Sequence, residues 1–155
     1  MFDINFVPES MKAPTASKLD RLEAASETNL RYGYFGTTVS IVTDGFGTES
    51  LHGTPALDFV FCLLYAVRKV RDGVVGSVSF TEDDTLINFT PANGRVMVTR
   101  SWDAVPGYCD TAQLVEVSIG FSEEVVDFIV RRYPSFGRNP TYGKLMSIVE
   151  ELKAG

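Results

Sequence analysis

Histidine and cysteine are scarce in this sequence. Its 155 residues include one histidine, His52, and two cysteines, Cys62 and Cys109. A zinc site needs three or four Cys, His or acidic ligands, which this set does not supply, and two cysteines make no disulfide scaffold. A Ser–His pair would need a signature such as G-x-S-x-G, which is absent. We therefore expect no metal site and no catalytic residues, with His52 a turn residue beside Gly53.

Nucleotide-binding motifs are also missing. No G-x-x-x-x-G-K-[ST] phosphate loop occurs, and the only G-x-G, at Gly45 to Gly47, lacks a third glycine and leads into no helical pattern. The sequence therefore predicts that the protein carries no cofactor.

Basic residues are outnumbered. There are 14 Lys and Arg against 20 Asp and Glu, giving a net charge of −6 and a pI near 4.8. The basic clusters, at 68–71 and 131–132, have the spacing of polar helix faces rather than of a nucleic-acid surface. The charge favours a basic protein partner, or solubility alone, and no nucleic acid.

Long apolar runs and a signal sequence are not found. The most apolar stretch, residues 56–67, is about a dozen residues long and contains Asp58, whereas a membrane span needs about 20 apolar residues. The opening "MFDINFVPES" has neither a positive region nor a hydrophobic run. We expect no membrane association and a cytoplasmic protein.

Apolar periodicity predicts a mixture of strands and helices. Alternation predicts strands, at 2–6, 30–35, 38–43, 75–80, 86–90, 95–102 and 113–121. Asn93-Gly94 fits a type I′ turn between the strands predicted at 86–90 and 95–102. Helices are predicted at 54–72, with Thr54 as N-cap, at 122–132 after a Ser122 cap, and at 142–153.

This order predicts an α+β fold. We expect a single domain over residues 1–155 with a mainly antiparallel sheet of about six strands, one apolar helix packed across it and two C-terminal helices. Residues 1–28 are expected to form a strand followed by a mobile or helical arm.

Three consecutive carboxylates, Glu82, Asp83 and Asp84, lie between two alternating apolar runs. Acids spread around a turn cannot converge on one cation, and the glycine and alternating ligands of a calcium loop are missing. The pattern favours the solvated tip of a hairpin, with a partner-binding surface as the alternative and a metal or catalytic site as the least favoured.

The stretch "RSWDAVPGYCDTA", residues 100–112, gathers Trp102, Asp103, Tyr108 and Asp110 in a predicted loop. Aromatic side chains beside carboxylates are typical of protein interfaces. Together with Glu82, Asp83 and Asp84 they form our predicted partner-binding set. The alternative is that Trp102 points into the core and the loop only crosses the sheet.

A second hypothesis is a small-molecule site or a small enzyme. Tyr32, Tyr34, Trp102 and Tyr108 would line a pocket into which Asp103 or Asp110 points. An aromatic cleft with one carboxylate can hold a small ligand or perform acid–base chemistry.

The runs "GYFGTTVSIVTDG", "LDFVFCLLYAVRKVRDG" and "LINFTPANGRVMVTRSW" resemble, in their layout over about residues 30–102, small bacterial immunity proteins of polymorphic or contact-dependent toxin systems. The resemblance implies an acidic, non-enzymatic domain that blocks a toxin by covering its active site. It assigns no role to an individual residue.

Overall fold

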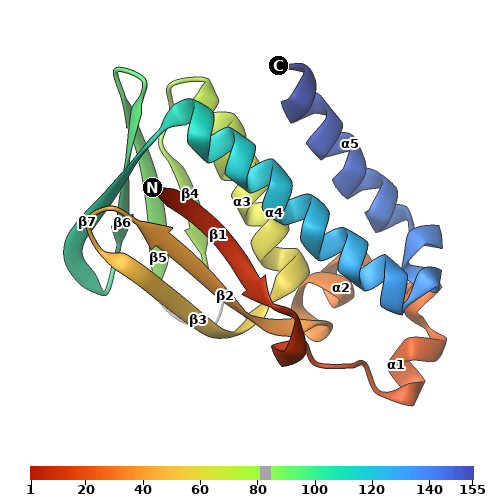
Figure 1. The fold of residues 1–155 in the computed structure, drawn as a ribbon. Coiled ribbons are helices and arrows are strands. Elements are labelled where there is room, and N and C mark those ends of the chain that lie inside the picture. The colour runs from red at the N-terminus through yellow and green to blue at the C-terminus, as the bar shows by residue number, and fades with distance from the viewer. Residues whose placement is uncertain (81–84) are drawn as a thin grey trace.

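Two antiparallel sheets form the β part of the protein. The structure, a computed structural model, describes residues 1–80 and 85–155, and within these the sheets have the orders β1-β2-β3 and β4-β5-β6-β7 (Figure 1). The strands are β1 (Phe2–Val7), β2 (Gly36–Thr43), β3 (Gly47–Pro55), β4 (Gly76–Ser79), β5 (Leu86–Ala92), β6 (Arg95–Arg100) and β7 (Asp103–Asp110). The α+β class and the antiparallel pairing are confirmed, while the single sheet of about six strands is wrong.

The two sheets meet at one corner. An isolated antiparallel bridge joins Asp44, in the β2–β3 turn, to Tyr108 of β7. The approach is so close that a Cβ atom on Gly107 would overlap the side chain of Thr43, and one on Gly45 would overlap the carbonyl oxygen of Pro106. Glycine is therefore required on both sides of this corner.

The apolar helix is where the sequence predicts it. Helix α3 (Ala56–Arg71) buries eleven of its sixteen residues, against the predicted span of 54–72. Its N-cap is Pro55 rather than Thr54, whose hydroxyl donates instead to the carbonyl oxygen of Leu51. Strand β4 approaches it so closely that a Cβ atom on Gly76 would overlap the backbone of Ala66.

The predicted strand at 113–121 is wrong. Helix α4 (Thr111–Arg132) runs through it without interruption, and the predicted loop at 103–110 is strand β7. Ser118 and Ser122 face the core in the middle of α4, so the prediction that Ser122 caps a helix is wrong. These two serines lie on the buried face of α4, whose other buried residues are larger and apolar.

The region between β1 and β2 is helical. It contains η1 (Pro8–Ser10), α1 (Ala16–Asp20), η2 (Leu22–Ala24) and α2 (Glu27–Gly33). The predicted strand at 30–35 is therefore wrong: the Ser26 hydroxyl accepts from the amide of Asn29 and starts α2. Asn139 fixes this region to the C-terminal part by donating to the carbonyl oxygens of Leu22 and Ala25.

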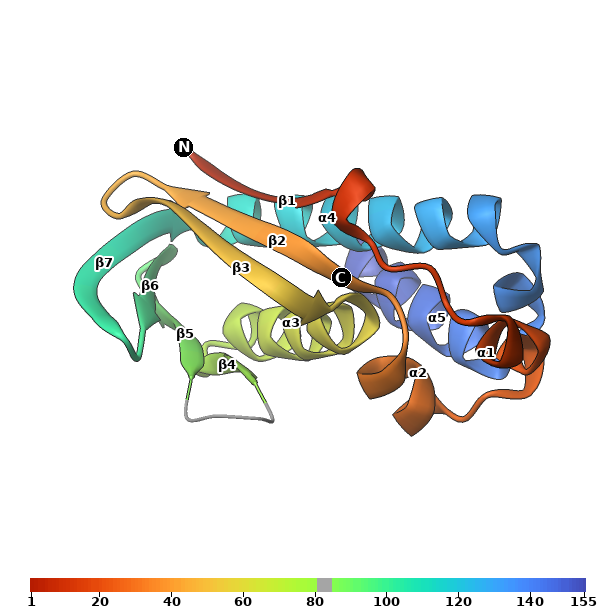
Figure 2. The ribbon, with the colours of Figure 1, turned by 90° about the horizontal axis from the view of Figure 1, so that it is seen from below.

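The helices pack as a layer against the sheets. After α4, η3 (Pro134–Arg138) leads to α5 (Pro140–Ala154), and Figure 2 shows the first sheet lying across α3 and α4. The Asn93-Gly94 turn between β5 and β6 is confirmed by positive φ angles of 55° and 79°. Among the helices of the described chain, none has the length and apolar character that crossing a membrane requires.

Candidate functional site

A groove lies beside the outer edge of β3. Its volume is about 510 Å³, and it is bounded by the end of α2, the start of α3, the end of β4 and the β6–β7 turn. We call it the β3 groove. The described residues that line it are Tyr32, Glu49, Ser50, Leu51, His52, Gly53, Thr54, Pro55, Asp58, Phe80, Thr85 and Trp102.

Strand β3 is the open edge of its sheet. It pairs with β2 on one side, and no strand in the described part of the chain pairs with its other side. Glu49 and Leu51 stand opposite the buried Ile41 and Val39, so they share the inner face of the sheet with these core residues. The groove therefore offers an unpaired strand edge together with inward-facing side chains.

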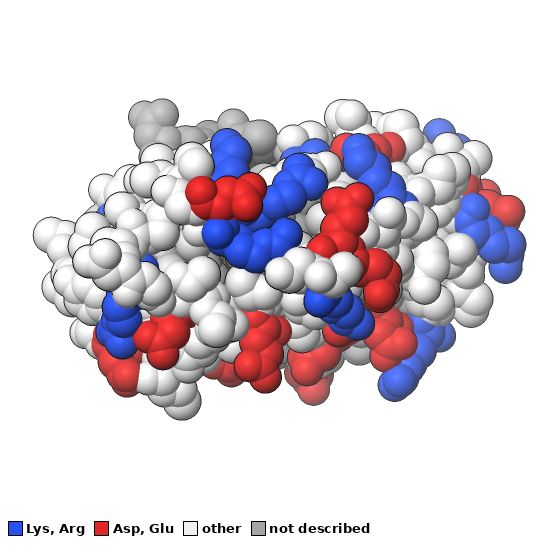
Figure 3. Space-filling view, turned by 90° about the horizontal axis from the view of Figure 1, so that it is seen from above, with Lys and Arg blue, Asp and Glu red and all other residues white. Residues whose placement is uncertain are grey.

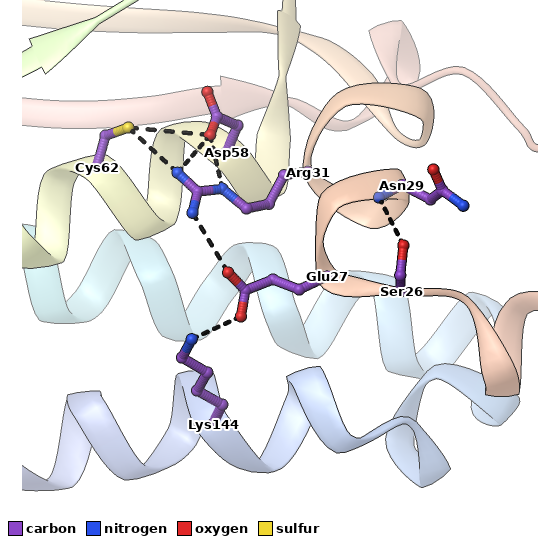
Figure 4. Close-up of polar contacts among 7 residues, drawn as sticks. All are labelled: Ser26, Glu27, Asn29, Arg31, Asp58, Cys62 and Lys144. Atoms are coloured by element: carbon purple, nitrogen blue, oxygen red, sulfur yellow. Dashed lines mark hydrogen bonds and ion pairs between the residues drawn. The ribbon is translucent and has the colours of Figure 1, made fainter.

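One end of the groove is held by a chain of alternating charges that links three helices (Figure 4). The Nζ of Lys144 donates to Glu27 Oε1 at 2.6 Å, and Glu27 Oε2 lies 3.4 Å from Arg31 Nη1. Arg31 in turn donates to Asp58 Oδ1 from Nε at 2.8 Å and lies 2.7 Å from it through Nη2. We call Lys144, Glu27, Arg31 and Asp58 the Arg31 chain.

The pKa values in this chain follow its contacts. The hydrogen bond from Lys144, followed by the charges of Lys144 and Arg31, lowers the pKa of Glu27 from its ordinary value. Burial acts to lower the pKa of Arg31, but the hydrogen bond and charge of Asp58 together outweigh burial and raise it. The contact between Lys144 and Glu27 thus favours the charged forms of both groups, and Asp58 favours the charged form of Arg31.

Asp58 ends this chain at the groove. Its side chain is only 9% exposed, and both Arg31 contacts are to Oδ1. Figure 4 shows Oδ2 pointing away from Arg31, and no described residue forms a hydrogen bond to it. The groove wall therefore contains a nearly buried carboxylate with one oxygen that no described residue binds.

The other end of the groove is held by a second buried arginine. Arg100, whose side chain is 7% exposed, donates from Nη1 to Glu49 Oε1 at 2.8 Å and lies 3.3 Å from Asp103 through Nη2. Its guanidinium carbon is 4.0 Å from the ring centroid of Phe46, and the indole of Trp102 also donates to Glu49 Oε1, at 2.7 Å. These five residues, which we call the Arg100 clasp, join the β2–β3 hairpin to the second sheet.

The structure separates the members of the predicted partner-binding set. Trp102 lines the β3 groove and is 40% exposed, and Asp103 belongs to the adjacent clasp. Tyr108 and Asp110 lie toward the other end of β7, where Tyr108 stands opposite Met97 and Asp110 pairs with Arg95. Strand β7 spans about 23 Å at about 3.3 Å per residue, a length that one protein interface can cover, so the partner-binding set stays a prediction.

Glu82, Asp83 and Asp84 lie outside the described residues. The expected hairpin tip and its role in partner binding therefore stay predictions. The residues that flank this stretch, Phe80 and Thr85, line the β3 groove.

The expected pocket of four aromatic residues is found in part. Tyr32 and Trp102 line the β3 groove, and Tyr32 is 46% exposed. Tyr34 is buried, with its hydroxyl donating to the carbonyl oxygen of Lys18, and Tyr108 lies outside the groove. Among the described residues, the acidic groups that face the groove are Glu49 and Asp58 rather than Asp103 or Asp110.

Sequence reasoning missed Glu49, Asp58 and His52 as groove residues. His52 lies on β3 rather than in a turn, and its Nδ1 is 3.3 Å from the Thr38 hydroxyl. Asp58 offered a usable signal, because it is the one charged residue in the apolar run from 56 to 67. A buried charge requires a partner, and that requirement points to Arg31.

The environments of both thiols disfavour the thiolate form. Burial, followed by the charge of Asp110, raises the pKa of Cys109 to about 11. Burial and then Asp58 raise the pKa of Cys62, which lies at the edge of the Arg31 chain. Neither environment activates a thiolate as a nucleophile.

Comparison of the chain with protein-family models, with curated proteins and with solved structures gave no match. Function is therefore inferred from the groove itself. Chemically, the groove can pair with a backbone along β3, stack against Tyr32 and Trp102, and accept hydrogen bonds on carboxylates.

Proposed function

We propose that this protein is a non-catalytic protein-binding domain that holds a segment of its partner in the β3 groove. The observation that supports this most is the open edge of β3 beside a groove with two half-exposed aromatic side chains, Tyr32 and Trp102. Addition of a strand to an open edge provides backbone hydrogen bonds, and pockets beside the edge provide selectivity. Trp and Tyr are the side chains most often found as anchors of such contacts.

The face formed by the ends of the long helices makes a weaker candidate. Figure 3 shows Lys and Arg side chains intermingled with Asp and Glu over this face. Arg68 pairs with Glu151, and Lys153 with Glu123 and Glu150. Opposite charges that pair with each other leave little field to attract a partner.

A site-specific photo-cross-link tests the proposal. Tyr32 and Tyr108 are equally exposed, at 46% and 43%, but only Tyr32 lines the groove. Each is replaced in turn by p-benzoylphenylalanine in the cell from which the gene comes, and adducts are identified by mass spectrometry. We expect a protein adduct at position 32 that is absent at position 108.

The reverse result would contradict the groove. An adduct at position 108 alone would place the partner on the outer face of the second sheet, near Asp110. Adducts of equal yield at both positions would indicate random collision.

The partner we propose is a basic toxin domain, which the protein neutralises by covering its active site. The net charge of −6 and the layout shared with immunity proteins support this identity. Excess negative charge would accelerate association with a basic cleft at low salt. Replacing Asp83 and Asp84 by Lys should then slow association, whereas Trp102→Ala should mainly speed dissociation. A cross-linked partner without a basic surface would exclude a toxin of this kind.

A small molecule is the second candidate for the same groove. The volume of about 510 Å³ falls in the range of ordinary ligand sites. A thermal-shift screen with metabolites tests this alternative, since a ligand that binds only the folded protein raises its unfolding temperature. A clear shift that is abolished in Trp102→Ala would favour the small molecule over the protein partner.

A further inference from the structure

Around the β3 groove, carboxylates line the surface and the arginines that pair with them lie behind it. Its described lining residues include two carboxylates, Glu49 and Asp58, and none of them is Lys or Arg. The cations that compensate these carboxylates, Arg100 and Arg31, lie behind them and do not line the groove. A ligand in the groove therefore meets negative charge first.

Among the described residues, each carboxylate is bound through only one of its two oxygens. Arg100 and Trp102 both donate to Oε1 of Glu49, and Arg31 donates to Oδ1 of Asp58. The second oxygens, Oε2 and Oδ2, accept from no described residue. A carboxylate has about four lone-pair sites, so each can accept a further donor without giving up its arginine.

At one end of the groove, the Arg31 chain adds to the preference for a positively charged ligand. Its charges alternate from Lys144 to Glu27, Arg31 and Asp58, and the last member before the groove is negative. The side chain of Asp58 is nine-tenths buried, so water screens its charge weakly. A cation that donates hydrogen bonds to Oδ2 would continue the alternation of charges along this chain.

Tyr32 adds a second recognition element at this end. It lines the groove beside Asp58 and is 46% exposed. An aromatic face attracts ammonium and guanidinium groups, and it packs against their aliphatic stems. A carboxylate and a tyrosine ring in one wall suit a Lys or Arg side chain better than an apolar or acidic one.

We infer that the β3 groove selects an extended partner segment that carries a Lys or Arg side chain, whose cationic head binds Asp58 Oδ2 beside Tyr32. This inference rests on the proposed function and specifies the chemistry of the bound segment. The straight part of β3, Glu49 to His52, spans about 10 Å, so about three or four residues of the segment pair with the strand. Glu49 and Trp102 at the far end offer the same combination for a second basic side chain.

The probe is a library of displayed random nonapeptides, selected on the full-length wild-type protein. We expect the selected peptides to contain a fixed Lys or Arg. Their binding should shift the amide resonances of Ser50 to Gly53 and the indole resonance of Trp102 in NMR spectra.

Affinity measurements on one selected peptide then isolate the charge. Replacing its conserved Lys by norleucine keeps the aliphatic chain and removes the cation, and we expect affinity for the wild-type protein to fall tenfold to a hundredfold. Asp58→Asn should cause a similar loss with the Lys peptide and little further loss with the norleucine peptide. Asp72→Asn, an exposed acid at the other end of the same helix, is the matched control and should leave affinity unchanged.

The outcomes separate the two proposals. If no selected peptide shifts the β3 resonances, the proposed function fails. If peptides bind at β3 but the norleucine peptide binds the wild-type protein equally well, protein binding stands and the cation inference is overturned. If n-butylammonium shifts these resonances but no peptide does, the groove is a site for a small cation and the inference is again overturned. The norleucine comparison leaves the protein unaltered, so it decides the matter even if Asp58→Asn does not fold.

Discussion

Arg31 and Arg100 each hold one carboxylate of the β3 groove, but they do so in different surroundings. Arg31 links three helices, its side chain is 19% exposed, and its partner Glu27 is shared with the exposed Lys144. Arg100 links two sheets, is 7% exposed and stacks on Phe46, and its Nε is buried without a partner in the described part of the chain. The guanidinium of Arg31 is thus more accessible to water than that of Arg100, although Asp103 in the Arg100 clasp is 45% exposed.

The two arginine clusters therefore differ in how much they contribute to holding the fold together. Helices α2, α3 and α5 also contact one another through the hydrophobic core, so the Arg31 chain adds to packing that already exists. Within the described residues, the backbone bridge between the sheets is at the corner of Asp44 and Tyr108, and the Arg100 clasp adds polar side-chain contacts between them. We therefore expect the clasp to matter more for stability.

Arg100→Met should have the largest effect. It leaves Glu49 and Asp103 without their cation and removes the polar contact between the sheets, and the free energy of unfolding should fall by about 3 kcal/mol. Urea denaturation measures this change. The control is Arg95→Met, whose ion pair with Asp110 is exposed and which should cost less than about 0.5 kcal/mol. Equal losses of unfolding free energy in the two variants would show that the Arg100 clasp contributes no more to stability than an exposed ion pair.

Arg31→Met should be less damaging, with a loss of about 1.5 kcal/mol in the same measurement. Glu27 retains Lys144, and Asp58 lies in the first turn of α3, where the helix dipole favours an anion. Arg131→Met, which removes an exposed pair within α4, is the control. A loss as large as that of Arg100→Met would contradict the proposed contrast.

The pH dependence of stability should identify Glu27. Because its pKa in the folded protein is lowered from the ordinary value of 4.5, chiefly by the Lys144 hydrogen bond, its contribution to stability is present above pH 4.5. That contribution is lost as the pH falls below 4.5 through the lowered pKa. Urea midpoints measured from pH 7 down to pH 3 should therefore fall less in Glu27→Gln than in the wild-type protein. Parallel curves would mean that the Lys144 contact is absent in solution.

Thiol labelling should give the smallest and most local signal. Cys109 lies on β7 near the sheet corner with its pKa raised to about 11, whereas Cys62 is half-buried beside Arg31. With Ellman's reagent at pH 8, we expect Cys62 to react faster than Cys109, with Cys62→Ser and Cys109→Ser assigning the two phases. Arg100→Met should accelerate the Cys109 phase alone, and acceleration of both would indicate general unfolding.

Secondary structure was predicted well from the sequence where apolar pattern, charge and turn residues all indicated the same element. The helix at 56–71 has a dense apolar pattern, cations in its last turn and a glycine after it, and the structure agrees within two residues. The Asn93-Gly94 hairpin was predicted because few residues accept positive φ at both positions.

The error at 113–121 has a physical cause. Val115, Val117 and Ile119 alternate and are β-branched, which is typical of a strand, but they are only half-buried. The residues that face the core are Leu114, Ser118, Phe121 and Ser122, spaced as in a helix. Two of these four residues are serines, so the spacing of the apolar residues alone does not reveal the helical period.

The candidate site was the least predictable part. Trp102 was identified from its residue type, but Glu49 and Asp58 depend on which carboxylates face the same space. That arrangement depends on the packing of α2 and the β6–β7 turn around β3, and no local pattern specifies it.

The open edge of β3 also limits what else can pair with it. A strand that can receive a partner can in principle receive another copy of itself, and this is how sheets grow into aggregates. Here Gly53 has a left-handed φ of 66°, Pro55 has no amide hydrogen, and the register with β2 shifts between Thr37 and Val39. These irregularities leave only the residues up to His52 straight enough for pairing. The bend that closes one end of the groove therefore also prevents the edge from serving as a template for open-ended self-assembly.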